Sequence, residues 1–339
     1  MLLYTDAICL KHQPGIGHPE SPERLSRTLE SFRQSPPLQT KWAPIERAVE
    51  QDVMRVHAPS YVQHIANLRG QQVAIDADTV LSPHSVDAAL IAAGGGLTAL
   101  RAIERGADSS AFILARPPGH HAEAASGMGF CVFNHIAVAA AYALDVLSYE
   151  RILVIDWDVH HGNATQHMFE NDPRVLFVSL HQSPFYPGTG MMAEVGKNDG
   201  TGYTVNIPLQ AGCNDADYCE IFRHLIRAAA EAYGPELILV SAGYDAHEAD
   251  PLGGMKMSSQ GFGTLAREVR EIADQFTDGK TVFFFEGGYH PTAVEESIRQ
   301  TIDVFLGNKK ATGIETSRIA FEVLQDLKTV HGPHLLGQL

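Results

Sequence analysis

Six short stretches of the chain consist mainly of consecutive apolar residues. Continuous apolar runs, without alternation of polar and apolar positions, are typical of strands that are covered on both faces of a sheet. We therefore predict buried β-strands at residues 111–115, 151–156, 174–180, 203–209, 236–243 and 281–288.

Longer segments with a helical spacing of apolar residues lie between several of these strands. They cover residues 133–147, 215–234 and 258–276. Strands that alternate with helices form βαβ units, and such units build a largely parallel sheet with helices on both faces. The pattern therefore predicts the α/β fold class.

A further segment, residues 85–106, is rich in Ala and Gly and contains three consecutive glycines, Gly94 to Gly96. A phosphate-binding loop would follow a strand and precede a Gly-Lys-Ser/Thr sequence, and neither feature is present. We expect instead a helix whose small side chains let its neighbours pack closely.

Composition narrows the class of protein. The 339 residues are 45% hydrophobic and 19% charged, which is ordinary for a globular protein, and no linker or repeat divides them. We therefore predict a single domain, residues 1–339.

The chain reaches Asp6 before an apolar stretch of signal-peptide length, and no run of about 18 apolar residues occurs, so neither export nor a membrane is expected. Four cysteines without C-x-x-C spacing favour reduced thiols in a cytoplasm.

The charge balance bears on the partners. The formal net charge is −15, and Lys and Arg are scattered along the chain. Because nucleic-acid binding requires clustered cations that release counterions, nucleic acid is not an expected partner. A negative surface can attract cationic substrates, although many acidic proteins carry such charge without a role in binding. The sequence leaves a monomer and a homo-oligomer equally open.

Polar clusters follow four of the predicted strands. They read "RPPGHHAE" (116–123), "DWDVHHGN" (156–163), "YDAHEAD" (244–250) and "EGGYHP" (286–291). In open α/β sheets the ligand site lies outside the carboxyl ends of the strands. We therefore expect the chemistry of the protein at these four positions.

One cluster indicates a metal site. Asp156, Asp158 and His160 are two residues apart, so they share one side of an extended strand end. Two carboxylates beside an imidazole are costly to bury unless a cation neutralises them. Asp158 and His160 together with Asp245 would supply three ligands and leave a fourth position open, as in catalytic zinc sites. Asp-x-Asp alone also occurs in magnesium-dependent phosphatases and in loops that only form hydrogen bonds.

Three more residues could act on a substrate beside this metal. His120 and His121 can accept and return protons near neutral pH. Tyr289 follows Gly287 and Gly288, and its phenol could donate to an oxyanion that develops on a carbonyl. Each motif alone has a structural explanation, as loop histidines or as a turn with a packed aromatic ring. Their common place at strand ends favours an active site.

These motifs closely resemble those of the zinc-dependent histone deacetylase superfamily. Besides the clusters above, the resemblance rests on "GFCVFN", "SLH", "PGTG" and "DPLGG", and it extends from residue 18 to Tyr289. The nearest branches are the class II deacetylases, the bacterial histone deacetylase-like amidohydrolases and the acetylpolyamine amidohydrolases. The resemblance implies the arginase/deacetylase fold, in which an eight-stranded parallel sheet lies between two layers of helices, and one Zn²⁺ per chain.

The resemblance also implies residue roles. Asp158, His160 and Asp245 correspond to zinc ligands. His120 corresponds to the general base with Asp156 as its partner, and His121 to a second histidine backed by Asn163, where class I enzymes have Asp. Tyr289 corresponds to the residue that polarises the acyl carbonyl. The substrate tunnel corresponds to Gly129, Phe130, Tyr186, Leu252, Gly287 and Gly288. Two potassium sites correspond to Asp156, Asp158, His160, Ser179 and Leu180, and to Phe169, Asp172, Val175 and Tyr203.

The expected reaction is removal of acetyl or other short acyl groups from the ε-amine of lysine or a related primary amine. One alternative is an acetylpolyamine deacetylase, but the acidic gatekeeper of polyamine-selective relatives is replaced here by Leu252. The arginase branch uses two manganese ions and a denser ligand set than the three residues matched here. A non-catalytic module that binds acylated ligands would be expected to have lost Tyr289 or a tandem histidine.

Overall fold

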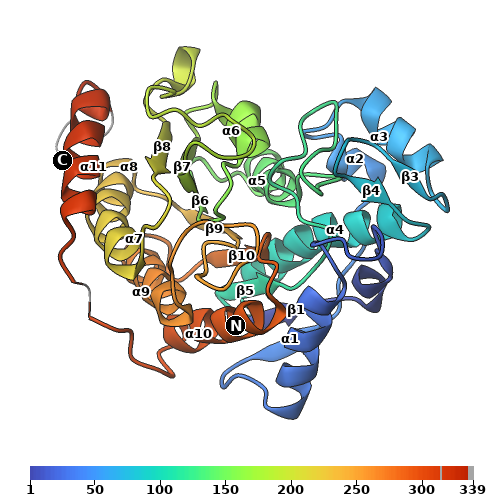
Figure 1. Cartoon of the computed structure of the whole chain (residues 1–339). Helices are drawn as coiled ribbons and strands as arrows, with labels where there is room; N and C mark the ends of the chain where they lie inside the picture. Colours follow the sequence, from blue (N-terminus) through green and yellow to red (C-terminus); the bar gives the residue numbers. More distant parts are fainter. Residues whose placement is uncertain (314, 335–339) are drawn as a thin grey trace.

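The computed structural model describes residues 1–313 and 315–334, and its centre is an eight-stranded sheet (Figure 1). The strand order is β2-β1-β5-β10-β9-β6-β7-β8, and every neighbouring pair is parallel. The strands are β1 (Leu2–Tyr4), β2 (Lys41–Ala43), β5 (Ser110–Ile113), β6 (Ile152–Asp156), β7 (Val175–Gln182), β8 (Thr204–Leu209), β9 (Leu237–Ala242) and β10 (Thr281–Phe285). A separate antiparallel pair consists of β3 (Val73–Ala74) and β4 (Val80–Leu81).

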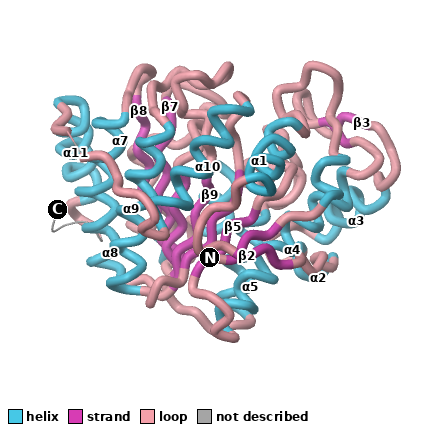
Figure 2. The backbone as a smooth tube through the Cα atoms, turned by 90° about the horizontal axis from the view of Figure 1, so that it is seen from below, coloured by secondary structure: helices cyan, strands magenta, loops and turns pink. Residues whose placement is uncertain are grey.

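Helices cover both faces of this sheet (Figure 2). On one face α4 packs against α5, and on the other α10 packs against α9 and α1. The helices are α1 (Glu23–Gln34), α2 (Glu50–Val53), α3 (Pro59–Asn67), α4 (Ser85–Glu104), α5 (His135–Asp145), α6 (Asn163–Phe169), α7 (Asp215–Ile221), α8 (Arg227–Tyr233), α9 (Ser259–Phe276), α10 (Pro291–Phe305) and α11 (Arg318–His331). Two 3₁₀ turns (Ala7–Lys11 and Asn198–Gly200) and a π-helical turn (Phe222–Ile226) complete the elements.

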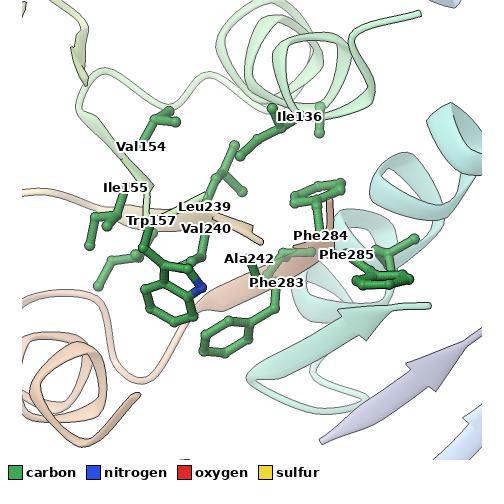
Figure 3. Close-up of a cluster of buried hydrophobic side chains, with 14 of the residues drawn as sticks. Ile136, Val154, Ile155, Trp157, Leu239, Val240, Ala242, Phe283, Phe284 and Phe285 are labelled. Atoms are coloured by element: carbon green, nitrogen blue, oxygen red, sulfur yellow. The ribbon is translucent and has the colours of Figure 1, made fainter. Parts of the chain in front are cut away.

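The buried faces explain why the strands are continuously apolar. Phe284 of β10 stacks on His135 of α5, with 5.5 Å between ring centroids, whereas its neighbour Phe283 packs edge-on against Phe305 of α10 at 5.1 Å. Consecutive residues of β10 therefore enter opposite helix layers, and Figure 3 shows Phe283 and Phe284 among buried side chains of β6 and β9. Burying a phenylalanine fully stabilises the fold by about 1.5–3 kcal/mol.

The structure confirms the α/β class and all six predicted strands, with ends shifted by up to three residues. It adds β1 and β2, which have three residues each and are too short for the apolar pattern to reveal. The segment predicted as one helix at 215–234 is α7, the π-helical turn and α8 in succession.

The glycines of α4 allow close packing, as predicted. A Cβ atom at Gly95 would lie 2.6 Å from the Ile113 side chain of β5, and one at Gly96 would lie 2.8 Å from the Phe284 ring of β10. Larger side chains would push this helix away from the sheet. Within the described residues α4 is also the one helix long and apolar enough to span a membrane, although no such segment was expected from the sequence. Its most apolar stretch is 89% buried inside the fold.

The strand order positions the functional residues. β5, β10, β9 and β6 are consecutive neighbours in the sheet, and these are the four strands that the polar clusters follow. Because all four are parallel, their carboxyl ends lie at one edge, where ligand sites of such sheets form. Residues more than 100 positions apart in the sequence therefore meet there.

Candidate active site and metal centre

Asp158, His160 and Asp245 converge at this edge and are buried. One potential ligand atom from each lies within 4.8 Å of the others. His160 Nδ1 is 3.0 Å from Asp158 Oδ1 and 3.2 Å from Asp245 Oδ2. Strand β6 ends at Asp156, so Asp158 and His160 lie in the loop after it rather than on an extended strand. The predicted grouping is present, although its local geometry differs from the expected one.

This donor set fits a metal ion. Asp245 Oδ2 is buried and has no hydrogen-bond partner in the described part of the chain. Burial alone would lower the pKa of His160, but the two carboxylates raise it to about 10. The group therefore favours a positive charge at this point, and a divalent cation meets that need. Oxygen and nitrogen ligands in this number are typical of catalytic zinc.

Two glycines let the carboxylates approach one another. A Cβ atom at Gly243 would collide with the Asp158 carboxylate, and one at Gly287 would collide with the carboxylates of both Asp158 and Asp245. The backbone N–H of Gly287 also donates to Asp158 Oδ2 at 2.8 Å. Gly287 was predicted only as part of the tunnel, but it lies directly against the metal-ligand carboxylates.

His120 and His121 lie side by side, with 3.9 Å between ring centroids, and differ in the side chain that contacts Nδ1 of each ring. His120 Nδ1 is 3.0 Å from Asp156 Oδ2, whereas His121 Nδ1 is 2.7 Å from Asn163 Oδ1. Burial lowers the pKa of both rings, but Asp158 and Asp156 raise that of His120 well above its usual value. For His121, burial and the neighbouring His120 and His160 leave the pKa well below it. The two histidines therefore differ in basicity.

Glu286 holds the loop that carries His120, and the sequence analysis missed it. Its carboxylate accepts hydrogen bonds from the backbone N–H of Gly119 at 2.7 Å and of His120 at 3.3 Å, and from Ser241 Oγ at 3.2 Å. Burial raises the pKa of Glu286 to about 8. An acidic residue directly after the apolar run "TVFFF" was the signal that could have identified it.

A pocket of about 210 Å³ leads to His121, His160 and Tyr289. Phe185 stacks on the His160 imidazole at 5.0 Å, and Tyr186 packs edge-on against His121 at 5.2 Å. Phe130 packs edge-on against the Tyr289 ring at 5.7 Å. Phe185 was not among the predicted tunnel residues; it is the more enclosed of the two aromatic neighbours, while Tyr186 is 37% exposed. The pocket is lined by Asp78, His121, Gly129, Phe130, His160, Phe185, Tyr186, Leu252 and Tyr289.

Tyr289 lines this pocket and is 9% exposed. Burial raises the pKa of its phenol well above the usual value, so the hydroxyl keeps its proton and can donate. Its backbone N–H donates to Asp250 Oδ2 at 2.6 Å. The Arg24 guanidinium lies 4.7 Å from the Tyr289 ring centroid and donates to the carbonyls of Gly288 and Glu286.

The other predicted residues lie as follows. Gly288 adopts φ +112°, which a residue with a side chain rarely adopts, and it precedes Tyr289. Ser179 is the register partner of Asp156 on the adjacent strand β7, and Leu180 follows it. Phe169 and Asp172 form a turn in which the Asp172 N–H donates to the Phe169 carbonyl at 2.9 Å. Val175 begins β7, and the Tyr203 carbonyl accepts a hydrogen bond from Phe177 of that strand.

Comparison with known proteins agrees with this geometry. Residues 18–305 match the sequence model of the histone deacetylase domain. The chain belongs to the histone deacetylase family. Among its relatives, a probable deacetylase of Archaeoglobus fulgidus is 38% identical over 284 residues, which is 83% of this chain and 79% of that protein. The human polyamine deacetylase HDAC10 is 36% identical over 93% of this chain and 49% of its own length.

The fold is likewise that of the family. The crystal structure of the HDA15 HD domain superposes with a TM-score of 0.90 at 32% identity, covering 97% of this chain and 93% of that one. The protein therefore has the arginase/deacetylase fold and is a deacetylase of a zinc-dependent family, with a buried Asp-His-Asp group that can bind the metal. The predicted fold, family and enzyme class are confirmed.

Proposed function

We propose that this deacetylase removes acetyl or other short acyl groups from the ε-amine of lysine in peptides. The observation that carries the proposal is the pocket of about 210 Å³ with Phe130 and Phe185 in its wall and the metal ligand His160 in its lining. Apolar ring faces suit the methylene chain of a lysine side chain. The polar side chains that line the same pocket, His121, His160 and Tyr289, suit the binding of an amide carbonyl.

Asp158, His160 and Asp245 would hold zinc, and the bound ion would lower the pKa of water towards about 7 and polarise the acyl carbonyl. His120 donates its Nδ1–H to Asp156, so its Nε2 can take a proton from the attacking water. Tyr289 donates its hydroxyl proton in a hydrogen bond to the acyl oxygen as negative charge develops there. His121 or His120 then delivers a proton to the departing amine.

The residues also support catalysis over ligand binding alone. Both histidines and Tyr289 are present, and the phenol is held protonated by burial. A variant that tests this is Tyr289→Phe, because it removes one oxygen and leaves the ring contacts with Phe130 and Arg24 in place. Chelation should abolish hydrolysis of an acetyl-lysine peptide and added zinc should restore it; activity that survives complete removal of metal would refute the proposal.

Acetylpolyamines are the second candidate, and one observation favours them. Asp78 lines the pocket and supplies negative charge there, which would attract a cationic substrate. Its Oδ1 already accepts hydrogen bonds from Gly129 N–H and Thr79 Oγ1, however, and Leu252 in the same lining offers no partner for an ammonium group. We therefore rank the peptide first. A higher kcat/KM for N-acetylputrescine than for an acetyl-lysine peptide would reverse that order.

The remaining proposals concern ions and context. We propose potassium at Asp156, Asp158, His160, Ser179 and Leu180, supported by the β6–β7 register, and a second potassium at Phe169, Asp172, Val175 and Tyr203. Replacing K⁺ by Na⁺ at constant ionic strength should then lower the melting temperature.

We further propose that residues 1–339 act as one domain in the cytoplasm, without nucleic acid or membrane as partner. A gel-filtration series would establish whether the protein forms a homo-oligomer.

A further inference from the structure

His121 is backed by the side-chain amide of Asn163, and the two ends of an amide differ. Asn163 Oδ1 lies 2.7 Å from His121 Nδ1, and Asn163 Nδ2 lies 2.5 Å from Glu123 Oε1. Were the amide reversed, Nδ2 would face His121 and Oδ1 would face Glu123. The first orientation requires a proton on His121 Nδ1, and the reverse requires a lone pair there. Whatever fixes the amide therefore fixes the tautomer of His121.

Glu123 discriminates between the two orientations. A glutamate carboxylate accepts hydrogen bonds and cannot donate them, so only the Nδ2 end of Asn163 can face it favourably. The reverse orientation would place two oxygens against each other in a half-buried position. His167 Nδ1 lies 2.8 Å from the same Glu123 Oε1 from the solvent side, which holds the carboxylate in place.

The backbone of Glu123 is also fixed. Its carbonyl lies 2.9 Å from His57 Nδ1, and it forms an isolated antiparallel bridge with Ser126. The Glu123 backbone is thus held by these contacts, and its carboxylate by His167 and Asn163. This is the arrangement of a positioning group, because Glu123 does not line the pocket and touches His121 only through Asn163.

We infer that Glu123 is a positioning residue that fixes the tautomer of His121 by orienting the Asn163 amide. Neutral His121 then donates Nδ1–H to Asn163 and leaves the Nε2 lone pair to the pocket that it lines. The catalytic consequence rests on the proposed function: His121 begins the cycle with a free Nε2 lone pair, so it can donate to the leaving amine only after it has received the proton that the attacking water gave to His120.

Glu123→Met removes the acceptor with little change in side-chain length, so nothing then selects one end of the amide. Glu170→Gln is the matched control, because Glu170 caps the C-terminus of α6, the helix that Asn163 begins, and pairs with Lys197 Nζ at 2.7 Å. It has no hydrogen bond with Asn163 in the described structure. Both variants remove one negative charge from the same region. An effect of Glu123→Met that Glu170→Gln shares would be an effect of charge and would overturn the inference.

The direct readout is the tautomer itself. Long-range ¹H–¹⁵N correlation spectra of the zinc-bound protein, labelled in histidine, distinguish a protonated Nδ1 from a protonated Nε2, and the His121→Ala spectrum assigns the signal. We expect Nδ1–H in the wild type and in Glu170→Gln, and a mixture of tautomers in Glu123→Met. An Nε2–H wild type, or an unchanged single tautomer in Glu123→Met, would overturn the inference.

Turnover provides the second readout. We expect Glu123→Met to lower kcat about tenfold with little change in KM, which is part of the hundred- to ten-thousand-fold that a positioned acid–base group contributes. The double variant Glu123→Gln with Asn163→Asp exchanges amide and acid: the new amide donates to the new carboxylate, which still accepts Nδ1–H of His121. It should regain kcat to within about threefold of the wild type. A double variant no better than Glu123→Met would count against orientation as the cause.

The two hypotheses fail in different ways. A wild type that hydrolyses neither acetyl-lysine peptides nor acetylpolyamines would refute the proposed function, but the spectra would still report the His121 tautomer. A normal wild type with a tautomer that does not respond to Glu123→Met would refute only the inference about Glu123.

Discussion

Glu20 is the residue whose replacement we expect to damage the protein most clearly outside the metal centre. It is fully buried between two guanidinium groups: Arg116 donates from Nε at 2.6 Å and from Nη2 at 2.5 Å, and Arg24 donates from Nη1 at 2.9 Å. His12 Nε2 lies 3.2 Å from the same carboxylate. Glu20→Gln keeps the shape of the side chain and removes the charge that both arginines need.

The magnitude follows from burial. Removing one partner of a buried ion pair leaves an uncompensated charge and costs about 3–5 kcal/mol, and here the glutamine N–H₂ would also face a guanidinium N–H. Since a domain is stable by about 5–15 kcal/mol in total, Glu20→Gln should remove about a fifth or more of the free energy of unfolding. Because Arg24 also holds the carbonyls before Tyr289, kcat should fall as well.

The assay is urea unfolding of wild type and variant at the same saturating zinc concentration. Glu30→Gln is the control, because Glu30 is exposed on helix α1, which also carries Arg24, and its contact is with Gln34. We expect a loss of about 3–5 kcal/mol for Glu20→Gln and a loss within about 0.5 kcal/mol for Glu30→Gln. Equal and small losses in both would refute the reasoning.

The pH dependence of the difference in free energy of unfolding between wild type and Glu20→Gln is a second test. Burial raises the pKa of Glu20, but Arg116, His12 and Arg24 together lower it far below its ordinary value of 4.5. A group whose pKa is depressed by folding stabilises the protein above its unfolded pKa and loses this contribution as the pH falls. The difference between wild type and Glu20→Gln should therefore be constant from pH 6 to 8 and shrink only below about pH 4.5.

Three further predictions concern the active site. Tyr289→Phe should lower kcat about a hundred- to a thousand-fold, the usual loss of one oxyanion donor, with zinc content by atomic absorption unchanged. Gly287→Ala should weaken zinc binding about ten- to a hundredfold, measured by competition with a chelator, because its Cβ would displace the carboxylates of Asp158 and Asp245. Leu252→Glu should raise the ratio of kcat/KM for N-acetylputrescine over acetyl-lysine peptide by roughly tenfold, because it supplies a partner for the ammonium group; an unchanged ratio would remove Leu252 from substrate selection.

The sheet was predictable as far as hydrophobic runs were long enough to recognise. The six strands with both faces covered need apolar side chains at successive positions, as Phe283 and Phe284 show by entering opposite helix layers. β1 and β2 each contribute three residues, and Trp42 of β2 is exposed, so no apolar run marked that edge strand. The number of strands therefore came from the family resemblance and not from periodicity.

The site was predictable where one residue type serves one chemistry. Asp158, His160 and Asp245 are metal ligands by type, and the parallel strand order brings them together. Glu286 and Phe185 were missed, because the sequence shows which polar and aromatic residues follow the strands but not which of them bind backbone N–H groups or stack on a ligand histidine. Their roles depend on contacts with residues 167 and 25 positions away, respectively.

The two adjacent histidines show most clearly what sequence alone leaves undetermined. His120 and His121 are identical in type and neighbours in the chain, but strand β6 places a carboxylate behind the first, and helix α6 places an amide behind the second. The carboxylates of Asp156 and Asp158 raise the pKa of His120, whereas burial leaves His121 neutral. The Asp156 carboxylate can only accept a hydrogen bond, so it fixes a proton on Nδ1 of His120 by itself, whereas the Asn163 amide has a donor end and an acceptor end. Only His121 therefore needs a further residue that selects between its tautomers. Glu123, three residues from His120 in the same loop, is placed to do so.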